Sequence, residues 1–397
     1  MHKLYIRLAY PIFIWFIIIK SFAGPIGLIL PAINYSGVLF MTALLIVRWI
    51  GALLHKPAVL MLTMMFVLYI IIGIINTKLI QVVFAIYIFI PFIYCIAFAD
   101  VLFSKVFYGN KFFIYLSIIS ALGVIYVNHF GAPWVGGVLN IGGHEKVLSR
   151  DWTTNGISRI PGFTGASFDA ATIIMISGFF VLFDFVQRKL WLPLGMLIIL
   201  FFYAIYLTTT KTAIITFGFL SLLLLLPAVL TNLMSKLIVL ISIIFTYICM
   251  FSVTGNRGGY ITNTFLMRMY ETWPAAIRLL EDNIDLIFGK GFGAIGTPAL
   301  FFDAQNYNAA DNAFVYLYII AGIPSVILVI LFLARYFSAS FETGLIKNEY
   351  YLCSLCVFIG GLTYNLFESV FYAPFAGILV GVIFQKKYLQ TDISNLK

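Results

Sequence analysis

The sequence is poor in charge, which excludes a water-soluble domain. Asp, Glu, Lys and Arg make up only 10% of the 397 residues, whereas soluble domains contain roughly 25%. Hydrophobic residues make up 62% and the mean hydropathy is +1.06, which is more apolar surface than a core in water would bury. The composition therefore predicts an all-α polytopic integral membrane protein, since helices satisfy their own backbone hydrogen bonds in lipid.

Cysteine and histidine are also scarce. The four cysteines all fall in apolar runs, which indicates packing residues and no disulfide framework. Cys353 and Cys356 form a single C-x-x-C, but a zinc site requires a second pair or nearby histidines. His129 and His144 have no H-E-x-x-H motif or clustered acids beside them. We therefore expect neither a metal site nor a cofactor.

What the sequence does contain is a series of long apolar runs. About 20 apolar residues cross a bilayer as a helix, and on this basis we predict about twelve transmembrane helices in a single membrane domain, 1–397. The predicted spans lie near residues 8–30, 34–54, 58–75, 79–99, 112–129, 168–186, 190–208, 212–231, 235–253, 313–336, 350–366 and 369–385.

Basic residues in the short connections predict the orientation of these helices. With the N-terminus in the cytoplasm, the short outer connections hold only Lys78 and Lys211, and the other basic residues of short connections lie inside. By the positive-inside rule, both termini are then cytoplasmic. The same rule accounts for the net charge of +9, so we expect no nucleic-acid partner.

Two long segments, 130–167 and 254–312, are predicted to be large extracytoplasmic loops, and long loops in a compact protein are usually functional. The second contains GFGAIG, Gly291–Gly296, which matches the G-x-G-x-x-G of dinucleotide sites. Such a site needs a strand before the glycines and a helix after them. Here the polar segment EDNIDLIFGK precedes them and Thr297-Pro298 follows. We interpret the motif as a glycine turn and hypothesise that it is a hinge.

The second loop also contains an amphipathic pattern over residues 262–282. At helical periodicity Arg268 and Arg278 lie on one side with three acids, and Trp273 lies on the apolar side. This pattern predicts a helix along the membrane surface, with Pro274 as the start of a second segment. The arginines either bind an anionic substrate or contact lipid headgroups and neighbouring acids.

Two further cations stand at predicted outer helix ends. Arg159, in SRIPGFTGASFDAA (158–171), and Asp169 flank a glycine-containing turn. The arginine either binds an anionic group through parallel N–H donors or anchors at the interface. Lys211, in TTTKTAIITF (208–217), lies between two apolar spans. A cation there is costly unless it is paired or functional, and the alternative is that its amine reaches the outer phosphates.

Asp311 and Asn312, in NAADNAFVYLYIIAGIP (308–324), precede the tenth predicted span. Either residue type is a good N-cap for that helix. Alternatively, Asp311 places a carboxylate at the outer mouth of the bundle, where it would accept a proton from a sugar hydroxyl. The sequence leaves both roles open.

Taken in order, these motifs resemble the O-antigen polymerase and O-antigen ligase superfamily of cell-surface polysaccharide assembly. The similarity covers residues 158–325 through RIPGFTG, TKTA, RMYETW, LIFGKGFGAIG and ADNAFVYLYIIAGIP. Thr210-Lys211 departs from the family's usual Ser-Arg pair. Asp311-Asn312 departs from the His-Asn pair of the ligase branch, and this second departure favours the polymerase branch.

The resemblance implies an O-antigen or capsule polymerase of the bacterial cytoplasmic (inner) membrane, with its active site facing outward. Glycan would pass from undecaprenyl diphosphate to the hydroxyl of another lipid-linked repeat unit, with membrane lipid and a chain-length regulator protein as further partners. Fixed cations would hold the departing diphosphate. The residues implied as catalytic are Asp311, Arg268, Lys211 and Arg159, and those implied as substrate-binding are Arg278, Asn312 and Trp273.

Two alternatives stand beside this hypothesis. An O-antigen ligase would share the fold and most charges and differ in its acceptor. A lipid-linked oligosaccharide flippase or transporter would show related halves and charges buried in mid-span. The chain has no visible internal repeat, and Lys20 is an exception among few mid-span charges, which favours the polymerase.

Overall fold

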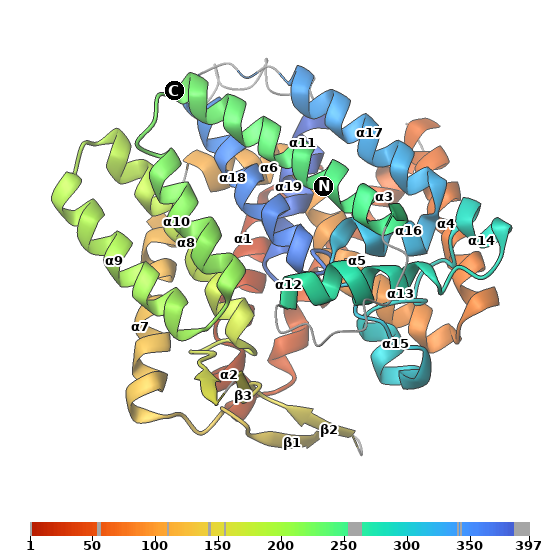
Figure 1. Ribbon diagram of the computed structural model, residues 1–397, viewed down its shortest axis with the longest axis horizontal. Helices are drawn as coiled ribbons and strands as arrows, with labels where there is room; N and C mark the ends of the chain where they lie inside the picture. Colours follow the sequence, from red (N-terminus) through yellow and green to blue (C-terminus); the bar gives the residue numbers. More distant parts are fainter. Residues whose placement is uncertain are drawn as a thin grey trace.

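The structure, a computed structural model, describes residues 2–53, 57–108, 111–141, 144–154, 156–252, 264–339, 341 and 344–384. Helices make up nearly all of its regular structure (Figure 1). Six of them are long and apolar enough to cross a membrane, and a seventh candidate consists of two helices that meet at 85°. By length and apolar composition the chain is therefore an all-α protein with several membrane-spanning helices. The number of about twelve spans stays a prediction.

Most helices follow the predicted apolar runs, but the predicted break at 232–234 lies inside α11, and the chain breaks at 224–227 instead. The long apolar ones are α3 (Ile33–Leu53), α4 (Pro57–Asn76), α5 (Leu79–Ala97), α7 (Lys111–Phe130), α8 (Ser167–Gln187) and α11 (Ala228–Ser252). The bent pair is α1 (His2–Ser21) and α2 (Ala23–Ile29). The shorter apolar helices are α9 (Trp191–Leu207), α10 (Lys211–Leu223), α17 (Ile323–Ser338) and α19 (Tyr372–Phe384). Helices α6 (Ala99–Tyr108), α16 (Ala313–Ala321) and α18 (Gly344–Thr363) complete the set.

Two predicted spans are broken helices. Residues 8–30 fall on α1 and α2, and residues 313–336 form α16 and α17. At the second break Gly322 has φ 54°, a left-handed conformation that favours glycine. A Cβ atom at Gly322 would lie 2.4 Å from Ile287 O. Close packing against the neighbouring segment therefore fixes this break.

Helix α8 lies at the centre of the bundle, because 78% of its span is buried inside the protein against 11% for α4. Helices α7 and α9 pack on α8, and α19 packs along α5 and α6. Phe113, Phe180 and Phe375 join α7, α8 and α19 through ring centroids 5.2, 5.9 and 6.1 Å apart. This packed centre holds in place the start of α8 and the connection that leads into α19.

The predicted outer loop 130–167 contains two β-hairpins, which the sequence did not reveal. Strands β1 (Val138–Ile141) and β2 (His144–Val147) pair antiparallel, as do β3 (Trp152–Thr154) and β4 (Ile157–Arg159). Figure 1 shows these strands beside α2 at the lower end of the molecule. Strands of three or four residues are too short for a period-two pattern to be recognised. The hairpin β3–β4 places Trp152 opposite Arg159.

The predicted outer loop 254–312 consists of short helices where the structure describes it. Residues 253–263, at its start, lie outside the described part of the chain. The described elements are α12 (Thr264–Met267), the π-helical turn η1 (Arg268–Thr272), α13 (Trp273–Ile277), α14 (Asn283–Phe288), α15 (Thr297–Phe302) and the 3-10 turn η2 (Ala304–Asn306).

The prediction of one amphipathic helix over 262–282 therefore needs correction. The helical stretch ends at Ile277 and is interrupted by η1. Pro274 supplies the physical reason, because it has no N–H to donate to the carbonyl four residues earlier. The N–H of Trp273 instead donates to Arg268 O, five residues back. The resulting π turn moves Arg268 out of the regular helical register.

The glycine turn packs tightly against α4 and α16. Gly291 has φ 76°, and a Cβ there would lie 2.2 Å from Gly73 N in α4. The Gly291 N–H donates to Ile320 O at 2.9 Å. Helix α14 and no strand precedes the glycines, in agreement with the rejection of a dinucleotide site. Close backbone approach explains the glycine, and a hinge stays a hypothesis.

Replacing Gly291 with alanine should destabilise the protein by more than ~2 kcal/mol, because alanine is strained at positive φ and would overpack against Gly73. Gly195→Ala in α9 is the matched control, since no atom lies within 4 Å of its Cβ position. That change should be neutral or stabilise by up to ~1 kcal/mol. Thermal unfolding in detergent compares the two, and equal melting temperatures would contradict the packing account.

Candidate functional site

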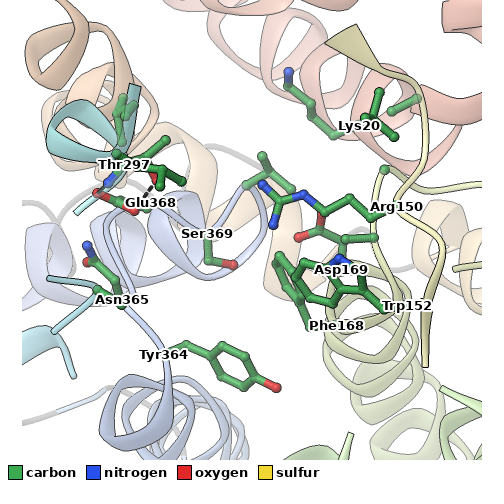
Figure 2. Close-up of a pocket in the computed structure, with 18 of the residues that line it drawn as sticks. Lys20, Arg150, Trp152, Phe168, Asp169, Thr297, Tyr364, Asn365, Glu368 and Ser369 are labelled. Atoms are coloured by element: carbon green, nitrogen blue, oxygen red, sulfur yellow. Dashed lines mark hydrogen bonds between the residues drawn. The ribbon is translucent and has the colours of Figure 1, made fainter. Parts of the chain in front are cut away.

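A pocket of about 590 Å³ opens between segments that are far apart in the sequence. Its walls come from α1, α5, the β-hairpins, α8, η1, α15 and the 364–371 connection between α18 and α19. Figure 2 shows the side chains that project into it. The charged residues of the lining are Lys20, Arg150, Arg159, Asp169, Arg268, Asp311 and Glu368.

Arg150 and Arg159 form a cationic wall around Trp152. Their guanidinium carbons lie 5.0 and 5.5 Å from the centroid of the Trp152 ring, which is cation–π distance. Within the described residues, neither guanidinium has a carboxylate within 4.0 Å. Arg159 Nε is moreover buried without a hydrogen-bond partner in that part of the chain. Buried donors without partners are rare, so Arg159 is available for an anionic ligand, and the exposed Arg150 lies against the same Trp152 ring.

Lys20 and Asp169 lie on the same side of the pocket as Arg150 (Figure 2). Lys20 Nζ donates to Asn34 O at 3.0 Å, which fixes the amine at the end of α1. Asp169 stands in the first turn of α8 and is only 9% exposed. Its Oδ1 atom has no hydrogen-bond partner among the described residues. Asp169 thus places one hydrogen-bond acceptor among the donors of Lys20, Arg150 and Arg159.

Arg268 and Asp311 form an ion pair in the lining of the pocket. Arg268 Nε lies 3.0 Å from Asp311 Oδ2, across 43 residues of sequence. Asp311 has φ 45°, a sparsely populated conformation that costs about 1–3 kcal/mol and is common in ligand sites. The turn before it is closed by Ala310 N–H, which donates to Asn308 Oδ1 at 2.7 Å. Arg268 and Asp311, two of the four residues implied as catalytic, therefore line the pocket, as Arg159 does.

Asn312, and not Asp311, caps α16. Its Oδ1 accepts from the N–H groups of Phe314 and Val315 at 2.9 and 3.2 Å. Its Nδ2 donates to Thr246 Oγ1 and Leu362 O at 3.2 and 3.3 Å. With its side chain fully buried and every polar group engaged, Asn312 ties α11, α16 and α18 together. The alternative left open for Asp311, that of helix cap, is thereby closed.

The other three predicted residues lie elsewhere. Trp273 is fully buried and packs edge-on against Phe265 with ring centroids 6.0 Å apart, so it belongs to the core. Lys211 and Arg278 are exposed, and neither lines the pocket. The structure thus brings together Arg159, Arg268 and Asp311, and leaves Lys211, Arg278 and Trp273 outside their pocket.

The sequence analysis missed Arg150 and Trp152 of the cationic wall, and it also missed Glu368. Its Oε1 accepts from Thr297 N–H at 2.8 Å, and its Oε2 accepts from the Thr297 hydroxyl. Gly296 makes room for this contact, since a Cβ there would lie 2.1 Å from Oε1. Burial raises the pKa of Glu368 to about 7, the hydrogen bonds from Thr297 and Tyr316 oppose this rise, and the charge of Asp311 adds to it. A lone acid within the apolar run YNLFESVFY was the available signal.

No group of three or more His, Cys, Asp or Glu is placed to hold a metal ion among the residues that the structure covers. Comparisons with protein-family models, curated proteins and solved structures find no match to the chain. The chemistry of the pocket is therefore the basis for inferring what the protein does.

Asn312 allows a direct test of the capping assignment. Asn312→Ala should destabilise by about 1–3 kcal/mol, because it removes the cap and leaves buried donors and acceptors without partners. Asn312→Ser keeps a capping oxygen and loses the bonds to α11 and α18, so its melting temperature should fall between those of Asn312→Ala and the unmodified protein. Thermal unfolding in detergent measures this order, and an unchanged melting temperature for Asn312→Ala would argue against the cap.

Proposed function

We propose that the protein is a glycosyltransferase that polymerises lipid-linked repeat units of a surface polysaccharide, O-antigen or capsule. It transfers glycan from undecaprenyl diphosphate to the hydroxyl of another lipid-linked repeat unit at the outer face of the bacterial cytoplasmic membrane. The observation that carries this proposal is a pocket in which arginines without carboxylate partners face carboxylates. The ordered motifs of residues 158–325 support it independently.

The cationic side of the pocket suits a diphosphate leaving group. Guanidinium groups bind phosphate oxygens through parallel N–H donors, and Arg150 and Arg159 have those donors available. Cations fixed where negative charge develops stabilise the transition state most when water is excluded. Trp152, Tyr307 and Tyr364 add aromatic surface to the lining, as is usual in sites for organic ligands.

The reaction needs only one displacement. The acceptor oxygen bonds to the anomeric carbon, the bond from that carbon to the diphosphate oxygen breaks, and a carboxylate of the pocket takes the hydroxyl proton. A single displacement inverts the anomeric centre. No cofactor or metal takes part in this scheme.

The position of the pocket agrees with a site that faces outward. Asn34, Phe84 and Asp169 line it, and each falls near the predicted outer end of its span. The proposal accordingly keeps about twelve spans, two large outer loops, both termini in the cytoplasm, and contact with membrane lipid. A chain-length regulator protein is the further partner that we expect.

The two rivals differ from the polymerase in measurable ways. A ligase would use the same pocket with a different acceptor. A strain without it would make chains of normal length and would fail only to attach them to the final acceptor. A flippase would carry its charges near the bilayer midplane. The charged residues of this pocket come largely from outer loops and helix ends, which favours transfer at the surface.

Deleting the gene should leave a single repeat unit on the final acceptor, as seen by gel electrophoresis of the surface polysaccharide. A ligase mutant would instead accumulate long chains on the lipid carrier. Normal chain lengths in the deletion strain would refute the proposal.

Restoring the gene with Arg159→Ala or Arg268→Ala should reduce polymerisation by about 10²–10³-fold, the usual effect of removing one donor to a developing negative charge. Arg188→Ala is the matched control, because its side chain is 62% exposed and pairs only on the surface with Asp184. The readout is chain length at equal amounts of membrane protein. Long chains with both pocket variants would remove these arginines from the mechanism.

A further inference from the structure

We propose that Glu368 is the general base that takes the proton from the acceptor hydroxyl, and that Asp311 positions Arg268. This inference rests on the proposed function and assigns its acid–base chemistry to a residue that no motif of the sequence marks. Three features of the site support it: the contact of Glu368 with Thr297, the ion pair of Asp311 with Arg268, and the position of Glu368 away from Lys20 and Arg150.

The contact with Thr297 orients the Glu368 carboxylate. Its Oε1 accepts a hydrogen bond from the Thr297 backbone N–H, and its Oε2 accepts one from the Thr297 hydroxyl (Figure 2). The two oxygens together have about four lone-pair sites, so the carboxylate keeps a site for a proton beside these two bonds and the Tyr316 hydroxyl, which also faces it. The left-handed Gly296, with φ 79°, brings Thr297 close enough for both bonds. Glu368 is therefore held in one orientation, which proton transfer requires.

Asp311 is in a different position. Its Oδ2 lies 3.0 Å from Arg268 Nε, and taking up a proton would cost it this ion pair. Arg268 is the cation that needs such an anchor, because it lies in the irregular turn η1 and not in a regular helix. Asp311 would hold the Arg268 guanidinium toward the pocket. It would thus help Arg268 to stabilise the leaving diphosphate and would not contact the acceptor.

Glu368 lies apart from Lys20 and Arg150 in the pocket (Figure 2). Figure 2 shows Glu368, Thr297 and Asn365 on one side and Lys20 and Arg150 on the other, with Ser369 between them. The side with Lys20 and Arg150 fits the donor diphosphate, and the Glu368 side fits the acceptor sugar. Asn365, Ser369 and Tyr307 also line the pocket and offer polar groups to sugar hydroxyls.

The step balances with these groups alone. The acceptor O–H bond breaks as the new bond from oxygen to the anomeric carbon forms, and the proton passes to a Glu368 oxygen. The bond between the anomeric carbon and the diphosphate oxygen breaks, and its electron pair leaves with undecaprenyl diphosphate. The lipid-diphosphate-linked repeat units are the only reactants.

Other charged and titratable groups face Glu368 from several elements. The 303–312 segment contributes Tyr307 and Asp311, α16 contributes Tyr316, and α5 contributes only the uncharged Phe84 and Ile88. The charged groups elsewhere in the lining are Lys20, Arg150, Arg159, Asp169 and Arg268. The burial of Glu368 outweighs the effects of its neighbours and raises its pKa to about 7. A base with a pKa near the working pH is the most effective one.

The test uses the purified full-length protein and lipid-linked repeat units extracted from the deletion strain. The rate of chain extension by the unmodified protein should rise as pH increases through about 7, because Glu368 must lose its proton to act. Glu368→Gln should lower kcat by about 10²–10⁴-fold with little change in KM, and its residual rate should lack this rise. Glu368→Asp should recover part of the rate and keep the rise.

Two further variants test whether Glu368 is the general base or has only a structural role. Thr297→Val removes a hydrogen bond that lowers the pKa of Glu368, so the rise should move to higher pH. Asp311→Asn should lower the rate and keep the rise, which should move to lower pH because the charge of Asp311 raises the pKa of Glu368. If Glu368→Gln does not fold, Glu368→Asp and Thr297→Val decide the question through their pH profiles.

The outcomes distinguish this inference from the proposed function. If the unmodified protein extends chains and Glu368→Gln does so within threefold, with the same pH profile, Glu368 is structural and the inference falls alone. A rise that disappears in Asp311→Asn and persists in Glu368→Gln would make Asp311 the base. If the unmodified protein extends no chains, the proposed function and the inference fail together.

Discussion

The double hydrogen bond between Thr297 and Glu368 is the contact on which the site depends. It joins the connection before α19, at the packed centre of the bundle, to the end of the glycine turn. That turn in turn lies against α4 and α16 through glycines that admit close backbone approach. The contact thus links the packed helices to a pocket whose walls also include loops and hairpins, and such rigid support is what the proposed catalytic role requires.

Because the chain has few charged residues, those that line the pocket are informative about its function. In a chain with 10% charged residues, a charge away from the membrane surface is expensive unless it is paired or used. Arg268 and Asp311 are paired, whereas Arg150 and Arg159 lack carboxylate partners within the described residues. Such an arrangement leaves donors ready for an anion, and it is the physical basis for placing a diphosphate there.

The sequence predicted the helices well, because apolar runs of membrane length are a strong signal, and it identified Arg159, Arg268 and Asp311 as members of one site. It failed where the decisive feature was local geometry or a distant contact. The π turn at η1 follows from one proline, and the hairpins are too short to show periodicity. Glu368 lies in a short connection within an apolar run and gains its meaning only from Thr297, 71 residues away. Lys211 and Trp273 were implied by the resemblance of short motifs, which does not report which way a side chain points.

The most direct test of the account is a structure of the protein with undecaprenyl diphosphate bound in a lipid nanodisc. The account predicts the diphosphate within hydrogen-bond distance of Arg150 and Arg159, with Arg268 still paired to Asp311 and the Glu368 side of the pocket open for the acceptor. A diphosphate bound outside this pocket, or in it without contact to these arginines, would contradict the central claim.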